Sequence, residues 1–331
     1  MYFFHDRLVE YVLEVFRATD FKDAADGDSF FGLFAPGNTS YLADRPFERF
    51  HDYEELLLRL MGTDIQKYKR VHKGTPLYFM SWLAFDLRNY EKALFYIDAS
   101  ISEDVRKDPA GWQGNPGARF LLLDPQDQGA ARTVLGVRLI LERELQRFNY
   151  ISNLPNLEVD GSWGKFVRRL LADSPQRTII SALYVFVLEF DDRVRELKLR
   201  EGSAGGSNQP FTVHLFTGGL LFESLLKHCY PTNDTGGRNH TLGDVLRTPR
   251  FLQDFSLANV PPGSAQTLKE IHDAIQGGSD VETAFATAAK LRNTTGHNLV
   301  WDDVFATHQN YVDLFQQVMN ALLFVIARKL I

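Results

Sequence analysis

Residues Ser279–His297 have the sequence SDVETAFATAAKLRNTTGH and carry the start, body and stop signals of one helix. Ser279, followed three residues later by Glu282, predicts a capping box in which each side chain binds a backbone amide of the other residue. Gly296 predicts the helix end, because glycine is preferred where a helix closes in a left-handed conformation. Apolar or small residues recur between these signals at helical spacing. They are Val281, Ala284, Phe285, Ala288 and Leu291.

The same periodicity extends along most of the chain, and it predicts an all-α protein. One segment, residues 77–105, has the pattern of a helical hairpin with its turn near Arg88 and Asn89. The other predicted helices are residues 2–16, 51–61, 130–150, 175–200, 211–230, 242–255, 264–276 and 301–330.

The second half of the hairpin, Asn89–Ile97, resembles the second helix of a tetratricopeptide repeat. Its small residue Ala93 lets two helices approach, and Leu87 and Tyr90 fit the apolar positions of that repeat. No second copy follows at the spacing of about 34 residues typical of the family. Because one unit cannot bury its own face, the resemblance implies tetratricopeptide-like helical packing rather than a repeat array.

A glycine- and serine-rich segment, Glu201–Pro210, has the composition of a flexible linker. It divides the chain into a predicted N-terminal helical domain, residues 1–200, and a predicted C-terminal helical domain, residues 211–331. The N-terminal domain would regulate the C-terminal one or bind a protein partner or an activating ligand.

The composition excludes several classes of function. A net charge of −6 argues against a generally cationic nucleic-acid coat, although a local basic groove remains compatible with it. Cys229 is the only cysteine, which excludes an internal disulfide and a cysteine-based zinc site. The sequence has no HExxH motif and no glycine-rich phosphate loop, so we expect no metal and no cofactor. It has no signal-peptide pattern and no apolar run near 18 residues, so we expect a cytoplasmic location and no membrane span.

Two residues near the end of the first segment, Arg292 and His297, point to phosphodiester chemistry. Arginine offers a fixed fork of donors matched to a phosphate, and histidine moves protons near neutral pH. In an unbroken helix, residues five apart diverge by about 140° around the axis. A turn at Gly296 would instead let both side chains face the same space.

The pattern Arg-Asn-x-x-x-His at a helix end, within residues 211–331, resembles the HEPN superfamily. The resemblance implies a helical bundle that acts as a metal-independent endoribonuclease. Two protomers of a homodimer would pair their motifs into one composite site, and cleavage would use the 2′-hydroxyl of the RNA itself. Arg292 would bind the scissile phosphate, His297 would act as general acid or base, and Asn293 would orient the site. A role in stress or anti-phage defence, as a regulated toxin or effector, follows from the same resemblance.

One branch of that superfamily is nucleotidylated on a tyrosine two residues beyond the histidine, a position held here by Leu299. The resemblance therefore disfavours that variant for this chain.

Other interpretations remain open at this point. Arg292 could cap the helix, with Asn293 in a turn and His297 bound to the backbone, and the protein could be a non-catalytic scaffold that binds a protein partner or RNA. We interpret Glu223 as an exposed-face glutamate, with pairing to Arg292 as the alternative. The basic run Lys67–Lys73 indicates a solvated helix face or loop, with RNA contact as the alternative.

Overall fold

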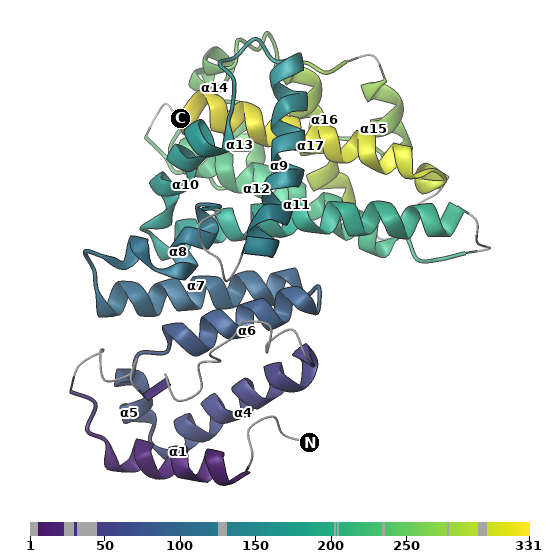
Figure 1. The fold of residues 1–331 in the computed structure, drawn as a ribbon. Coiled ribbons are helices and arrows are strands. Elements are labelled where there is room, and N and C mark those ends of the chain that lie inside the picture. Colours follow the sequence, from purple (N-terminus) through teal and green to yellow (C-terminus); the bar gives the residue numbers. More distant parts are fainter. Residues whose placement is uncertain are drawn as a thin grey trace. The chain divides into compact units, whose positions relative to one another are not determined.

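In the computed structural model, the described part of the chain consists of helices joined by loops (Figure 1). The described residues are 6–22, 30–31, 45–124, 131–201, 203, 205–233, 236–276, 278–296 and 303–331. Within these ranges, the only β pairing is an isolated antiparallel bridge between Thr232 and Arg238. The predicted all-α class is therefore confirmed.

The chain divides into two compact units. Unit 1 comprises residues 1–135 and 173–181, and unit 2 comprises residues 136–172 and 182–331. Before residue 124, the described part of unit 1 forms six α-helices and one 3-10 turn. They are α1 (Asp6–Ala18), α4 (Pro46–Thr63), α5 (Ile65–Arg70), α6 (Gly74–Asp86), α7 (Tyr90–Lys107), η1 (Trp112–Gly114) and α8 (Pro116–Leu121).

Unit 2 contains the remaining helices, two of which, α9 and α11, have their first residues in unit 1. They are α9 (Ala131–Ile151), η2 (Val159–Trp163), α10 (Gly164–Leu171), α11 (Ser174–Glu201), α12 (Gln209–Cys229), α13 (Leu242–Leu246), α14 (Pro249–Asp254), α15 (Leu268–Ile275), α16 (Val281–Thr295), η3 (Asp303–Phe305) and α17 (His308–Lys329).

These units differ from the predicted division at residues 201–210, because the side chains of α9 and α11 form a core with α17. The rings of Phe148 and Phe324 lie 4.8 Å apart between centroids, and those of Phe190 and Phe315 lie 3.7 Å apart. The glycine-rich segment therefore connects α11 and α12 inside unit 2. Its composition identified a loop, but composition does not record which helices pack across that loop.

The predicted hairpin of unit 1 is present as α6 and α7. Arg88 adopts a positive φ of 54° in the turn, and the Asn89 side chain caps α7 by accepting a hydrogen bond from the Lys92 amide. Ala93 is fully buried, as expected for a small residue where two helices approach. Both local signals, the turn and the small residue, were correct.

Three helices form the centre of unit 2: α12, α16 and α17 pack against one another. Between α12 and α16, the Phe222 and Phe285 rings lie 5.1 Å apart. On α12, the Gly218 position has no room for a side chain, because a Cβ there would lie 2.7 Å from Val318 of α17. Close packing at Gly218 therefore fixes the position of α12 along α17.

Two details of these helices differ from the prediction. The N-cap of α16 is Asp280, whose side chain accepts from the Thr283 amide, rather than Ser279. Aspartate and serine are about equally good caps, so sequence alone placed the start one residue early. The last helix begins at His308 and not near Trp301, because a short turn, η3, comes before it.

No helix within the described ranges combines the length and the apolar character needed to cross a membrane.

One buried histidine, His214 of α12, is held neutral by its surroundings. Its Nε2 lies 2.8 Å from the Phe186 carbonyl oxygen, which only accepts, so Nε2 carries the proton and donates it. Its Nδ1 then accepts from the Tyr311 hydroxyl at 2.7 Å. Burial, in which the charged imidazolium would lose its hydration, lowers the pKa of His214 to about 3.

We predict that His214 makes folding depend on pH between about 6.5 and 3. The unfolded chain takes up a proton on this residue below pH 6.5 and the folded chain does not, so stability is lost as pH falls. The free energy of unfolding of the wild type, relative to that of His214→Gln, should fall by up to about 1.4 kcal/mol for each unit by which the pH is lowered. Urea unfolding of both proteins at pH 7, 6 and 5 measures this difference.

The control is His51→Gln, since the His51 side chain is 54% exposed. Its substitution removes a histidine without removing a buried one, so its effect should vary far less with pH. A difference between the wild type and His214→Gln that stays constant over this range would contradict the prediction.

Candidate functional site

The Arg292 side chain lies in the last turn of α16 and is held by a carboxylate on α12. Its Nε donates to Glu223 Oε2 at 2.6 Å, and the other oxygen of Glu223 lies 2.6 Å from Lys227 Nζ. Glu223 is only 5% exposed, whereas the Arg292 side chain is 33% exposed. The interpretation of Glu223 as an exposed-face residue is therefore wrong, and the alternative, pairing with Arg292, is correct.

The Glu223 carboxylate is shared by two cations, which sets the charge of the site. Burial acts to raise the pKa of Glu223, but hydrogen bonds from Lys227 and Arg292 outweigh burial and hold that pKa below its usual value. Glu223 is therefore ionised near neutral pH. Because one carboxylate faces two cations, the cluster keeps an excess positive charge.

Asn293 links Arg292 to the loop that follows α14. Its Oδ1 accepts from Arg292 Nη1 at 3.1 Å, and its Nδ2 donates to the Gly263 carbonyl oxygen at 2.6 Å. The next residue, Thr294, donates from its hydroxyl to the Ala265 carbonyl oxygen at 3.2 Å. Of the guanidinium nitrogens, Nη2 makes no hydrogen bond to the described part of the chain. The guanidinium is thus oriented from two sides while one of its nitrogens is left for another partner.

Helix α16 ends where the sequence predicts, but not in the predicted conformation. Gly296 has φ −69°, a right-handed conformation, so the expected left-handed closure is wrong. A Cβ at Gly296 would lie 3.1 Å from the Arg292 carbonyl oxygen and from the Phe216 ring, so close packing explains the glycine better than backbone handedness. His297 and Leu299 lie outside the described residues, and so does the predicted pairing of Arg292 with His297.

The contact that positions Arg292 was not predicted from the sequence. A Cβ on Gly219 of α12 would lie 2.8 Å from the Arg292 Cβ and 2.9 Å from its Cα and N. The α12 backbone therefore reaches the α16 backbone at this point. The signal was available, because the doublet Gly218–Gly219 lies inside a helical pattern in which each glycine costs about 1 kcal/mol against alanine.

We predict that Gly219→Ala lowers the free energy of unfolding by about 1–3 kcal/mol, since the added methyl group must push α16 away from α12. The matched control is Gly136→Ala in α9, where an added Cβ would meet nothing within 4 Å. That change should stabilise the protein by about 0.5–1 kcal/mol through helix propensity alone. Urea unfolding measures both, and equal effects of the two substitutions would contradict a close contact at Gly219.

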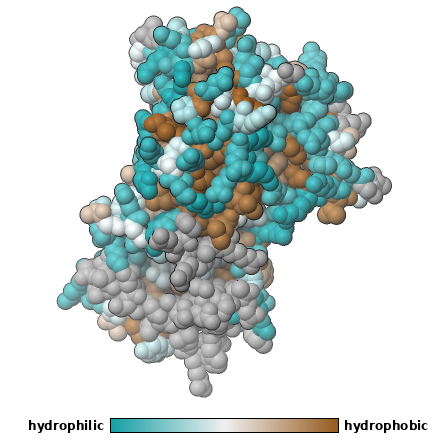
Figure 2. All heavy atoms as spheres, turned by 45° about the horizontal axis from the view of Figure 1, so that its top comes forward, coloured by the Kyte–Doolittle hydropathy of each residue, from teal (hydrophilic) through white to brown (hydrophobic). Residues whose placement is uncertain are grey.

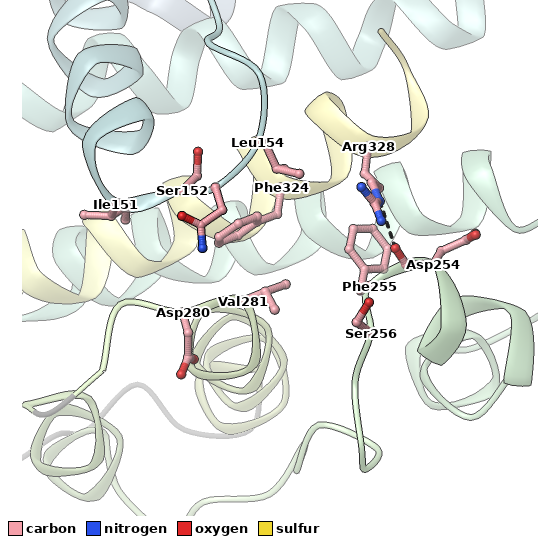
Figure 3. A pocket seen from close by; sticks show the side chains of 11 residues that line it. Ile151, Ser152, Leu154, Asp254, Phe255, Ser256, Asp280, Val281, Phe324 and Arg328 are labelled. Carbon is pink, nitrogen blue, oxygen red and sulfur yellow. Dashed lines mark hydrogen bonds between the residues drawn. The ribbon is translucent and has the colours of Figure 1, made fainter.

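A separate cavity of about 360 Å³ lies at the other end of α16 (Figure 3). Asp280, Val281 and Phe324 line it, together with Arg328, whose Nε donates to the Asp254 carbonyl oxygen at 3.0 Å. Val281 and Arg292 are eleven residues apart on one helix, about 16 Å along its axis. The cavity is therefore not part of the Arg292 site.

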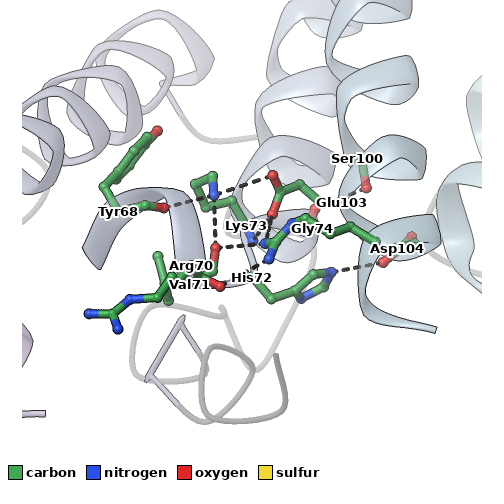
Figure 4. A network of polar contacts seen from close by, with 10 residues as sticks. Tyr68, Arg70, Val71, His72, Lys73, Gly74, Ser100, Glu103 and Asp104 are labelled. Atoms are coloured by element: carbon green, nitrogen blue, oxygen red, sulfur yellow. Dashed lines mark hydrogen bonds and ion pairs between the residues drawn. The ribbon is translucent and has the colours of Figure 1, made fainter. Parts of the chain in front are cut away.

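The basic run of unit 1 differs from its prediction at its C-terminal end. Lys69 and Arg70 are exposed at the end of α5, as a solvated face requires. His72 and Lys73 are only 4% and 7% exposed, and acidic side chains of α7 bind both (Figure 4). The prediction failed there because those carboxylates come some 30 residues later in the sequence.

Among the described residues, no three His, Cys, Asp or Glu side chains come together in a way that could hold a metal ion.

No protein-family model, no curated protein and no solved structure matches this chain.

Proposed function

We propose that unit 2 is a metal-independent RNA endonuclease that acts as a homodimer, with Arg292, His297 and Asn293 in its site. The observation that carries the proposal is the state of Arg292. It is one-third exposed, oriented by Glu223 and Asn293, and has Nη2 left for a ligand. The sequence motif and its resemblance to the HEPN superfamily supply the remaining support.

In the proposed reaction, Arg292 binds the scissile phosphate and offsets the charge that develops on it. His297 removes the proton of the neighbouring 2′-hydroxyl, or gives a proton to the leaving 5′-oxygen. The 2′-oxygen bonds to phosphorus as the bond to the 5′-oxygen breaks, so the products are a cyclic phosphate and a free 5′-hydroxyl. One Arg–His pair supplies either the base or the acid, and a second copy supplies the other.

The surface that we propose for that second copy is on α12. Apolar residues reach solvent on many proteins (Figure 2 shows such patches on one face), and single ones need no explanation. On α12, however, Val213 and Leu220 are two helical turns apart on one face, and they are 41% and 39% exposed. Leu220 and Glu223 differ by about 60° around the helix axis. A partner packed on this face would lie beside the Arg292 site.

We predict that the purified protein cleaves single-stranded RNA in excess EDTA and that His297→Ala lowers the rate about 10²–10⁴-fold, as loss of general acid–base catalysis does. Arg292→Ala should lower the rate by a similar factor, because it removes the phosphate contact. A fluorogenic RNA gives the rates. Arg195→Ala is the matched control, since that side chain is 60% exposed on α11 and should leave the rate unchanged.

Equal cleavage by the wild type and His297→Ala would contradict the assignment of His297. Absence of cleavage by a folded, dimeric wild type would favour the alternative, a helical scaffold that binds RNA or a protein partner without cutting.

We further predict that Leu220→Asp converts the dimer to a monomer and abolishes cleavage, because a charge at the centre of an apolar contact loses its hydration on association. Leu139→Asp is the control, since Leu139 is 70% exposed on α9 of the same unit. Sedimentation velocity measures the mass of each variant. A Leu220→Asp protein that stays dimeric, or that cleaves as a monomer, would contradict the composite site.

A further inference from the structure

Unit 2 carries a group of basic side chains around the C-terminal end of α17. In α10 every exposed residue is basic and none of the eight residues is acidic. Arg328 in the last turn of α17 and Arg250 of α14 are exposed, and Lys329 is partly exposed. The cationic patch consists of six residues: Lys165, Arg168, Arg169, Arg250, Arg328 and Lys329.

Contacts of Lys329 bring three helices together at the patch. Arg169 Nη1 of α10 donates to the Lys329 carbonyl oxygen at 3.2 Å, and Lys329 Nζ lies 2.7 Å from Asp254 Oδ2 of α14. The Tyr230 ring centroid lies 5.1 Å from Lys329 Nζ and 6.0 Å from the guanidinium carbon of Arg250. Cations that are far apart in the sequence are therefore close in space.

The patch keeps an excess of positive charge. Its contacts include one carboxylate, Asp254, which also accepts from the Tyr230 hydroxyl at 2.7 Å. A second, Asp280, lines the same cavity as Arg328. Six cations outnumber these two carboxylates. The net charge of −6 for the whole chain is therefore unevenly distributed, and the patch attracts anions.

Helix stability accounts for only part of the patch. Arg328 and Lys329 lie at the C-terminal end of α17, where the helix dipole favours cations. Lys165 and Arg250 instead lie in the first turns of α10 and α14, where the same dipole favours acidic residues. These two cations do not stabilise their helices, so they point to an anionic partner.

Three arginines of the patch have donors left for such a partner. Within the described part of the chain, Arg328 donates only from Nε, to the Asp254 carbonyl oxygen at 3.0 Å (Figure 3). Arg169 donates only from Nη1, and Arg250 makes no hydrogen bond there. Because a guanidinium offers a fork of donors that matches phosphate, these arginines favour a ligand with several phosphates.

The cavity of about 360 Å³ described above adjoins the patch, since Arg328 and Asp254 line it. Its two carboxylates already have partners, because Asp280 accepts from the Thr283 amide at 2.8 Å and Asp254 from Lys329 and Tyr230. Proteins that bind single-stranded nucleic acid combine a cationic surface with aromatic rings that hold bases. The apolar walls here include two such rings: Ile151, Leu154, Phe255, Val281 and Phe324.

We propose that the cationic patch binds the phosphates of single-stranded RNA and that one base enters the adjoining cavity. The choice of RNA rests on the proposed function. Tyr230 follows Glu223 by seven residues along α12, about 10 Å along the helix axis. Lys227, with a side chain that is 34% exposed, lies between them in the sequence. An RNA strand on the patch therefore reaches the Arg292 site within a few nucleotides.

Fluorescence anisotropy of labelled oligouridine tests the proposal on the full-length His297→Ala protein, which leaves the RNA intact under the proposed function. Adding Arg250→Gln and Arg328→Gln to this parent should weaken binding at least about fivefold. It should also reduce the slope of log K against log salt concentration by about 1.4, that is by about 0.7 for each phosphate contact. An abasic strand of the same length should bind the parent several-fold more weakly, because it lacks the base contact.

The matched control adds Arg195→Gln and Lys269→Gln to the same parent. It removes two positive charges from exposed positions of unit 2 outside the patch and should leave the affinity unchanged. Circular dichroism establishes that each variant is folded.

A folded patch variant that binds oligouridine like its parent would overturn the proposal, and equal binding of the abasic strand would overturn the place of the base. Binding of the parent to phosphatidylserine vesicles but not to oligouridine would assign the patch to a membrane surface instead. The nuclease proposal is tested separately. Patch-dependent binding without cleavage by the wild type would contradict the nuclease alone, and cleavage with patch-independent binding would contradict the patch alone.

Discussion

The backbones of α12 and α16 touch where Gly219 meets Arg292, and the geometry of the candidate site depends on that contact. Because a Cβ at residue 219 would lie within 2.9 Å of the Arg292 backbone, the two helices can approach so closely only with glycine there. The approach brings Glu223, one turn further along α12, to 2.6 Å from Arg292 Nε. The close packing of the two helices and the ion pair therefore occur at the same point.

Local signals in the sequence were enough to predict the long helices, because periodicity, turns and caps act over a few residues. The short helices α5, α8 and α10 were not predicted. The hairpin turn at Arg88 and the buried Ala93 show how well such signals work. Long-range packing was not predictable in this way. Nothing in the sequence around Phe148 and Phe190 indicates that they pack against α17. The division predicted from the linker composition therefore lies later in the chain than the division between the compact units.

The candidate site was predictable only in part, for the same reason. The motif gave Arg292 and Asn293, which the structure joins by a hydrogen bond of 3.1 Å. Glu223 is bound by Arg292, a residue 69 positions away, so its burial could not be inferred from its own helix. The prediction for His72 and Lys73 was wrong in the same direction, because their basic neighbours suggested solvent, whereas Asp104 and Glu103 bind them in buried positions.

The sharing of Glu223 has a consequence for how Arg292 could bind an anion. A carboxylate paired with Arg292 alone would neutralise it and weaken its attraction for phosphate. Lys227 takes the second oxygen of that carboxylate at 2.6 Å, so the cluster stays positive while the guanidinium stays oriented. A fixed cation needs no reorganisation when charge develops on a bound phosphate. The same helix exposes Leu220, so in the dimer that we propose one helix would both hold the charges of the site and contact the second copy.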